Sequence, residues 1–388
     1  MTPAEVRAAT SLAAIYGLRL FGMFIILPVF ALWSAELPGW DKAWVGLALG
    51  IYGFTQALLQ IPFGWLSDRI GRKPVLYVGL AVMALGSFVC AVSTSVAGVV
   101  IGRMLQGAGA ISSVTIAMTA DLTRESQRTK AMALIGITIG LAFALSFVVA
   151  PFLAAQIGVP GIFALTGSLA LAAMAVVRYR VPDVAEGGAR EPVRWSLILA
   201  DGQLMRLNFG MFTLHAILMA LFLVVPFDLA ATGLAAADHW MFYLGVIALS
   251  LALVAPVIRA GWAERHVLAL AAGLMLLCLL ALAILPRGLW ATACMLTLFF
   301  AAFNLLEAKL PALVSVRAPA GAKGSASGVF ASLQFLGIFA GASAGGLIAQ
   351  NVGNVAVLWF CVILSALWFI AALGVEPVRA DVNVTNSI

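Results

Sequence analysis

The feature that most restricts the fold is a succession of long apolar runs separated by short polar connections. A bilayer has a hydrocarbon core about 30 Å thick, and a helix needs about 20 apolar residues to cross it. Runs of that length lie near 9–33, 44–66, 74–93, 96–120, 127–152, 158–178, 205–229, 239–258, 266–285, 289–315, 325–350 and 354–375. In lipid, a chain must satisfy its backbone hydrogen bonds internally, which continuous apolar runs do as helices. The sequence therefore predicts an all-α integral membrane protein with twelve transmembrane helices.

The composition excludes an ordinary soluble protein. Of the 388 residues, 63% are hydrophobic and 10% are charged, whereas about 25% of residues in soluble domains are charged. The net charge of +6 is placed in connections between membrane spans, so we expect the lipid bilayer and no nucleic acid as a partner. The four cysteines stand singly inside apolar runs, and we expect no metal and no cofactor.

The basic residues alternate between successive connections. Those at the amino terminus, in every second connection and in the carboxyl tail are Arg7, Arg69, Arg72, Lys73, Arg124, Arg128, Lys130, Arg178, Arg180, Arg190, Arg194, Arg206, Arg259, Arg265, Arg317, Lys323 and Arg379. The remaining connections hold Lys42 and Arg287. Because basic residues are retained on the cytoplasmic side, both termini are predicted to be cytoplasmic, with the protein in a bacterial inner membrane.

The chain divides near its middle. The longest connection, 181–204, is polar and contains Gly187-Gly188, which is typical of a linker. We predict an amino-terminal six-helix bundle over 1–180, a cytoplasmic linker over 181–204, a second bundle over 205–376 and a short cytoplasmic tail over 377–388. A weak repeat supports two related halves, since Gly136-x-x-x-Gly140 matches Gly337-x-x-x-Gly341. Small residues at this spacing predict close helix packing.

One charged stretch lies between the second and third spans. Residues 64–74 read Gly-Trp-Leu-Ser-Asp-Arg-Ile-Gly-Arg-Lys-Pro, and they resemble the signature loop of the major facilitator superfamily, G-x-L-x-D-R-x-G-R-[KR]. Residues 103–109 are similar to the R-x-x-Q-G-x-G motif of its fourth helix. The sequence is most similar to the twelve-helix drug:proton antiporter branch. It departs in the fifth helix, where Gly140 is followed by Leu141 instead of proline. One bacterial member carries a soluble domain after its last helix, which is not expected here.

The resemblance implies a conformational gate in the charged stretch. Within the family, the arginine at position 72 pairs with an acid at position 121, and the acid at position 68 meets the amino end of the eleventh helix when the cytoplasmic side is closed. A carboxylate at that place is favoured by free N–H groups and the helix dipole. The candidate gating residues are Gly64, Asp68, Arg69, Gly71, Arg72 and Asp121. The other interpretation is a basic anchor to lipid headgroups, above all for Arg69.

A few ionisable residues lie inside predicted spans, where charge is costly and usually functional. Arg103, His215 and Glu307 are the candidates for proton coupling, and Glu307 is the one acid deep inside a span. Each has a structural alternative, because a buried ion or histidine can also be satisfied by its own bundle. His239 falls in a connection, and we expect it to be solvated.

Polar residues at helical spacing predict a substrate cavity between the bundles. The candidates are Arg19, Tyr52, Gln56, Gln60, Gln106, Asn208, Asn304 and Gln334. Packing inside one bundle is the alternative for each of them.

Together these features predict a proton-coupled secondary transporter that works by alternating access and exports amphiphilic small molecules. The expected partners are a small-molecule substrate and protons, with the chain acting as a monomer. A uniporter or metabolite exporter is the alternative within the class. An intramembrane enzyme and a receptor without flux are alternatives outside it. We expect no enzymatic activity.

Overall fold

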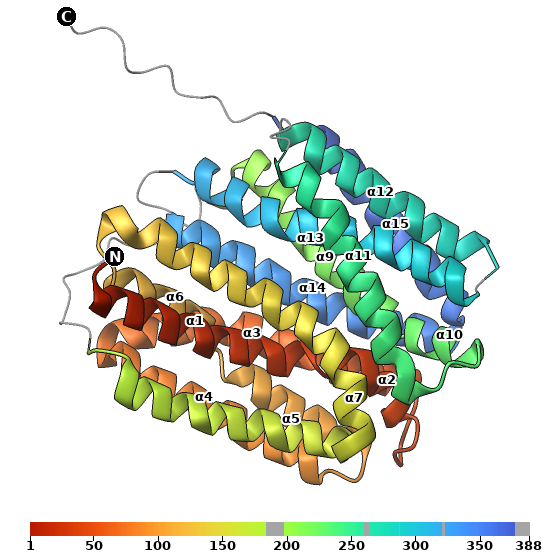
Figure 1. The fold of residues 1–388 in the computed structure, drawn as a ribbon, viewed down its shortest axis with the longest axis horizontal. Helices are drawn as coiled ribbons and strands as arrows, with labels where there is room; N and C mark the ends of the chain where they lie inside the picture. Colours follow the sequence, from red (N-terminus) through yellow and green to blue (C-terminus); the bar gives the residue numbers. More distant parts are fainter. Residues whose placement is uncertain (184–197, 260–263, 287, 320–322, 377–388) are drawn as a thin grey trace, which may run out of the picture.

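The computed structural model describes residues 1–183, 198–259, 264–286, 288–319 and 323–376. Every regular element in these ranges is helical (Figure 1). The elements are α1 (Pro3–Phe24), α2 (Leu27–Ser34), α3 (Lys42–Ile70), α4 (Arg72–Val92), α5 (Val96–Ala108), α6 (Ser112–Asp121), α7 (Glu125–Arg180), α9 (Gly202–Leu221), α10 (Val225–Ala231), the 3₁₀ turn η1 (Ala236–Asp238), α11 (His239–Arg259), α12 (Glu264–Ile284), α13 (Leu289–Arg317), α14 (Lys323–Asn351) and α15 (Asn354–Leu373).

Eleven helical segments within the described ranges are long and apolar enough to cross a bilayer. One of them covers 55 residues, and at 1.5 Å per residue it would be roughly 80 Å long, far more than one crossing needs. Gly158 interrupts α7 with a φ of 69°, so α7 consists of two helices joined at a sharp turn. The structure therefore has twelve crossings, and the predicted all-α membrane fold is confirmed.

Local sequence sets the ends of several helices. Thr2 caps α1 and exchanges hydrogen bonds with Glu5 in a capping box, which satisfies amide groups that would otherwise lack partners. The side chains of Asp41, Ser95 and Asp201 cap α3, α5 and α9 by accepting hydrogen bonds from backbone amides of the first turn. Each such cap contributes about 1 kcal/mol.

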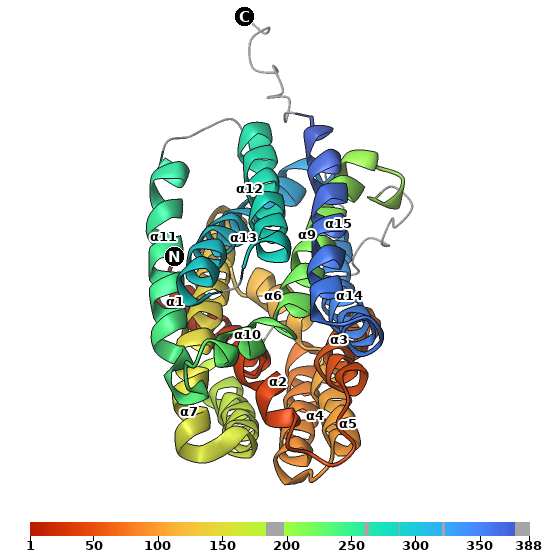
Figure 2. The same cartoon turned by 90° about the vertical axis from the view of Figure 1, so that its right-hand side faces the viewer.

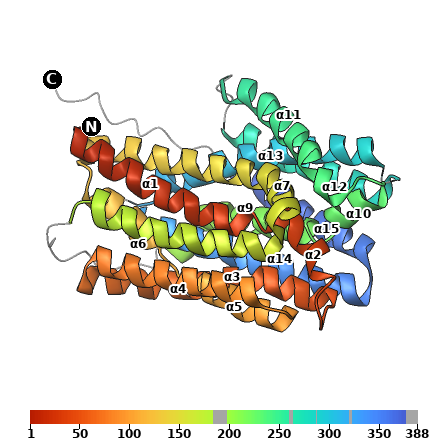
Figure 3. The same cartoon turned by 60° about the horizontal axis from the view of Figure 1, so that its bottom comes forward.

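The helices pack in two groups, α1–α7 and α9–α15 (Figures 1 and 2). The most extensive contacts between the groups are those of α3 with α14 and of α7 with α11, and α2 with α10, α7 with η1 and α3 with α9 also meet. Figure 3 shows α14 lying beside α3 between the groups. We propose 1–180 and 205–376 as the two bundles. The predicted tail and most of the predicted linker lie outside the described residues.

Glycines bring α3 and α14 into backbone contact. A Cβ added to Gly46 would lie 2.3 Å from the carbonyl oxygen of Ala342, and one added to Gly53 would lie 2.5 Å from that of Phe335. Atoms cannot approach this closely, so only glycine permits the observed separation of the helices. Gly337 and Gly341 make the same kind of contact with α9, as the glycine spacing predicts.

The prediction of close packing is wrong for the matching pair in α7. No atom of another element lies within 4 Å of a Cβ added to Gly136 or Gly140. The spacing is the same as in α14, but α7 presents these two positions to open space. Two glycines four residues apart identify a strip of helix surface without side chains. The tertiary arrangement decides whether another helix covers that strip.

These two environments give a matched test of packing. We expect Gly46→Ala to lower the midpoint of thermal unfolding, because the new methyl group must push α3 and α14 apart at a cost of about 1–3 kcal/mol. Gly140→Ala is the control, and alanine in a helix facing open space should be neutral or stabilising by up to about 1 kcal/mol. Equal thermal stability of the two variants, measured in the same detergent, would contradict this assignment.

Candidate functional site

Arg19 is the centre of a polar group on the amino-terminal side of the contact between bundles. Its side chain is 1% exposed. Its guanidinium donates to the hydroxyls of Ser112 at 2.5 Å and Tyr52 at 2.9 Å, and to the side-chain oxygen of Gln56. The Gln56 amide donates in turn to Gln60 Oε1 at 3.0 Å. These residues come from α1, α3 and α6, so the structure unites four predicted cavity residues in one network.

Arg103 and Gln106 lie inside the amino-terminal bundle. Arg103 Nη1 donates to Gln106 Oε1 at 3.0 Å, and its Nε donates to the Ala48 carbonyl at 3.4 Å. Gln106 Nε2 donates to Ser87 Oγ of α4 at 2.7 Å. Both side chains are therefore held between α3, α4 and α5. The structure brings Arg103 within 4.8 Å of the Tyr52 ring centroid, whereas Gln106 faces α4.

A second polar group lies on the carboxy-terminal side. The amide nitrogen of Gln334 is 2.8 Å from His215 Nε2. An amide NH₂ only donates, so Nε2 accepts and Nδ1 carries the proton that it donates to the Met211 carbonyl at 3.3 Å. Glu307 Oε2 lies 3.9 Å from His215 Nε2 and is buried without a hydrogen-bond partner. The sequence predicted these residues separately, and the structure joins them.

The two remaining cavity candidates lie apart from this group. Asn304 Nδ2 donates to Ser250 Oγ of α11 at 3.4 Å. Asn208 is 1% exposed, and its side-chain oxygen has no hydrogen-bond partner. Both are polar groups within the carboxy-terminal bundle.

An aromatic layer connects the bundles at the same depth, and sequence reasoning missed it. Phe143 stacks on Phe303 with centroids 5.2 Å apart, and Phe147 meets Phe300 edge to face at 5.5 Å. Phe303 also lies 5.8 Å from the His215 ring. The signal in the sequence was weak, because phenylalanines four residues apart are found in the core of most apolar helices.

The charged stretch forms a compact ion cluster at the end of α3. Arg72 is 7% exposed and reaches Asp68 Oδ1 at 2.6 Å and Asp121 Oδ2 at 3.0 Å. It also donates to Ser67 Oγ. Gly71 links α3 and α4 with a φ of 94°, a conformation that favours glycine.

The other gating candidates lie around this cluster. Arg69 stacks on the Trp65 ring at 3.8 Å, and Gly64 faces Ser113 of α6. Lys73 pairs with Asp183 at 2.8 Å, and that contact holds the pKa of the Asp183 carboxyl below its usual range. The contact between Asp68 and the amino end of the eleventh helix stays a prediction, because residues 320–322, which precede α14, lie outside the described residues.

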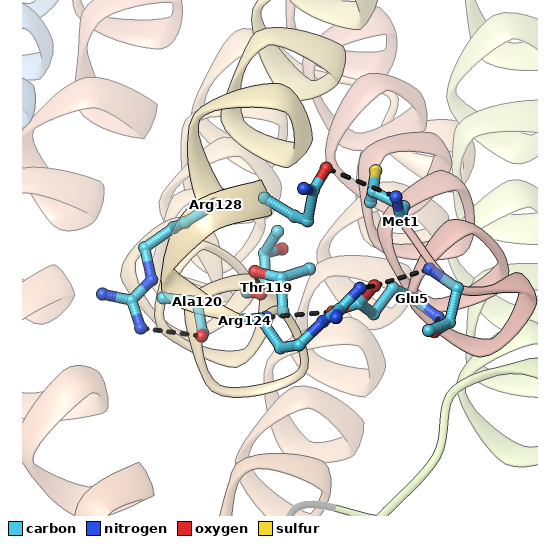
Figure 4. A network of polar contacts seen from close by, with 9 residues as sticks. Met1, Glu5, Thr119, Ala120, Arg124 and Arg128 are labelled. Carbon is cyan, nitrogen blue, oxygen red and sulfur yellow. Dashed lines mark hydrogen bonds and ion pairs between the residues drawn. The ribbon is translucent and has the colours of Figure 1, made fainter.

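A second ion pair ties α1 to the turn after Asp121 (Figure 4). Arg124 donates from its backbone N, Nε and Nη2 to the two oxygens of Glu5, at 3.1, 2.8 and 3.1 Å. The same carboxylate accepts the capping bond from the Thr2 amide. The Glu5 carboxylate raises the pKa of Arg124. Sequence reasoning also missed this ion pair of Glu5 with Arg124, which we call the clamp. The Thr-x-x-Glu spacing was a usable signal for the capping bond between Thr2 and Glu5, but not for the contact with Arg124.

One histidine corrects a prediction. His239 begins α11 and is 1% exposed, with Nε2 3.3 Å from the Leu234 carbonyl. It is therefore buried and bonded rather than solvated, because the Leu234 carbonyl of the preceding connection and the Tyr243 ring of α11 lie beside it.

Two groups of apolar helices that meet around buried polar residues define a two-bundle membrane transporter. Residues 12–342 match the family model described as Major Facilitator Superfamily. The chain belongs to this superfamily, and it is a transporter rather than an enzyme.

Known relatives agree. The chain is 41% identical over 387 residues to the Inner membrane transport protein YajR of Escherichia coli (strain K12), covering 97% of this chain and 85% of the relative. It is 26% identical to the Multidrug resistance protein MdtH of Aeromonas hydrophila, covering 95% and 96%. Among solved structures, a D-xylose-proton symporter matches with a TM-score of 0.76 at 14% identity, covering 96% of this chain and 98% of that one. The human organic anion transporter MFSD10 matches with a TM-score of 0.70 at 20% identity, covering 96% and 100%. These two likenesses concern the fold.

We propose that the ion cluster of Asp68, Arg72 and Asp121 acts as a conformational gate, and this role can be tested by mutation. Asp68→Asn removes one of the two carboxylates that hold Arg72 and the charge that the resemblance places against the amino end of the eleventh helix. We therefore expect flux to fall and the two groups of helices to separate at this end. Spin labels at Tyr179 and Val316, which are 81% and 61% exposed at the ends of α7 and α13, report that separation. Glu36→Gln is the control, because it removes an acidic charge from an exposed side chain that is remote from the cluster in the chain. An unchanged distance distribution in a flux-dead Asp68→Asn protein would remove the gating role.

Proposed function

We propose that this chain is a proton-coupled secondary active transporter that works by alternating access and exports amphiphilic small molecules across a bacterial inner membrane. The observation that carries the proposal is the Glu307 carboxylate, whose Oε2 is buried without a hydrogen-bond partner beside His215. The His215 ring beside it, with Phe303 next to that ring, provides an aromatic surface that suits amphiphilic molecules, and the named drug-resistance relative supports export.

Unequal contacts between the bundles support alternating access. Lys42, at the start of α3, donates from Nζ to Asn354 at 2.8 Å and from its backbone N to Gln350 at 3.1 Å. The same end of α3 carries the glycine contacts with α14. Towards the opposite end of the helices, Gly136 and Gly140 face open space. An arrangement packed at one end and open at the other is one state of a rocking cycle.

The chemistry of Glu307 supports proton coupling. An ionised carboxylate is costly at this depth, and protonation removes that cost. A carboxyl that gains a proton on one side and loses it on the other links the proton gradient to the conformational cycle. One charge crossing 100 mV provides about 2.3 kcal/mol, enough for a substrate gradient of about forty-fold. His215 is placed to tune or relay this proton.

A uniporter or metabolite exporter is the second candidate. The specific observation in its favour is Gly140-Leu141, because the antiporter branch has proline after that glycine. In either case we propose that the monomer is the functional unit.

Coupling is tested at Glu307. We expect Glu307→Gln to abolish uphill substrate transport driven by an imposed pH gradient and to retain downhill exchange, because the amide is a permanently neutral mimic. The measurement is substrate flux in proteoliposomes with and without the gradient. The control is Glu36→Gln, an exposed acid in the connection after α2. If Glu307→Gln drives uphill transport at the wild-type rate, Glu307 is structural and Arg103 or His215 becomes the next candidate.

Topology has its own test. Both termini and the linker are proposed to be cytoplasmic, because basic residues concentrate there. Single cysteines are introduced at Gly188 and at Asp238 in a cysteine-free protein, and intact cells are treated with a membrane-impermeant maleimide. We expect labelling at position 238 and none at 188 until the cells are opened. Labelling of position 188 from outside would reverse the proposed orientation.

A further inference from the structure

Two buried arginines flank one tyrosine ring in the amino-terminal bundle. The guanidinium carbon of Arg19 lies 5.9 Å from the Tyr52 ring centroid, and that of Arg103 lies 4.8 Å from it. Their side chains are 1% and 2% exposed. Neither arginine forms an ion pair with a carboxylate anywhere in the described ranges. The interior of this bundle therefore holds two positive charges that only neutral groups solvate.

The two arginines differ in how completely they are bonded. Arg103 donates to Ala48 and Gln106 within its own bundle. Arg19 uses both terminal nitrogens on hydroxyl and amide oxygens, but its Nε is buried without a hydrogen-bond partner. A buried N–H of a cation left unpaired is expensive. Of the two guanidinium groups, only that of Arg19 has a buried N–H without a hydrogen-bond acceptor, at Nε.

That atom belongs to a group at the contact between bundles. The Arg19 guanidinium lies 5.8 Å from the Phe335 ring of α14. Phe335 follows Gln334, whose amide donates to His215. The Arg19 guanidinium therefore lies near aromatic rings of both groups of helices, at 5.9 Å from Tyr52 of α3 and 5.8 Å from Phe335 of α14. The one acid on the opposite side, Glu307, is within 3.9 Å of His215 and forms no ion pair with Arg19.

We infer that the transported molecule is an amphiphilic organic anion whose carboxylate or sulfonate binds the Arg19 guanidinium. This inference depends on the proposed transport function and gives it a substrate class. The planar guanidinium matches such a head group and strengthens each hydrogen bond with its charge. The apolar tail lies against Phe335 and the aromatic layer of Phe143, Phe303 and Phe300. Export then carries negative charge outward, the direction that an inside-negative membrane potential favours.

Three probes with one tail separate the possibilities. Naphthalene-2-carboxylate, (2-naphthyl)trimethylammonium and 2-naphthylmethanol share an aromatic tail and differ in head-group charge. Their binding to the full-length protein in nanodiscs is measured by calorimetry. We expect the carboxylate to bind at least tenfold more tightly than the other two. Tighter or equal binding of the ammonium probe, or no binding of any probe, overturns the inference.

Variants assign the selectivity to Arg19. Arg19→Gln should weaken carboxylate binding at least tenfold and leave binding of the neutral probe unchanged, while Arg19→Lys should restore part of the preference. Arg7→Gln is the control, because it removes the same charge from an exposed position on the same helix. If Arg19→Gln fails to fold, Arg19→Lys and the wild-type selectivity still decide the matter. Carboxylate preference that survives in Arg19→Lys and Arg19→Gln alike contradicts the assignment.

Flux distinguishes this inference from the transport proposal on which it depends. Proteoliposomes that carry only the ammonium probe would support transport and overturn the anion assignment. Proteoliposomes that bind the carboxylate selectively through Arg19 but move none of the probes would support the anion site and overturn the transport function. Carboxylate flux that Arg19→Gln removes supports both.

Discussion

The cost of placing charge in hydrocarbon is the constraint on which this structure depends. An ionisable side chain at the depth of a membrane span must find partners within the protein or pay several kcal/mol. Arg19 and Arg103 donate to groups of α3, and His215 accepts from Gln334 of α14, whereas Glu307 Oε2 lies beside His215 without a hydrogen-bond partner. The polar residues therefore mark the inside of each bundle. They also make the two groups of helices chemically different, because α1–α7 contain the buried cations Arg19 and Arg103 and α9–α15 contain the carboxyl of Glu307.

The contact of α3 with α14 places these two sides next to each other. Glycines along α3 reduce the helix separation until backbones touch, and this brings Phe335 and Gln334 towards Arg19. Both ends of α3 carry polar contacts, Lys42 at one end and the cluster of Asp68 and Arg72 at the other. One helix thus carries a contact at its start, a central polar network and an ion cluster at its end.

The ion cluster at the end of α3 is itself supported by the adjacent clamp. Asp121 ends α6, and Arg124 three residues later is held by Glu5 of α1. Helix α1 also carries Arg19. The clamp therefore fixes the amino end of this helix to the turn that follows Asp121, the partner of Arg72. The resemblance to the superfamily identified Arg72 and Asp121 in advance. It gave no indication of Glu5, whose role depends on where the amino end of α1 meets a distant turn.

The sequence by itself determined the twelve crossings and identified most of the buried side chains that carry a charge, an amide or an imidazole. The length of hydrophobic runs, the alternation of basic residues and helical spacing are local properties of the chain. The thickness of the bilayer and the retention of basic residues on one side of it act on these properties directly. The tertiary structure alone decided which faces meet. It covered Gly337 and left Gly136 open, buried His239, turned Gln106 towards α4 and stacked Phe143 on Phe303. Identical local patterns acquire different roles because packing depends on residues that are far apart in the chain.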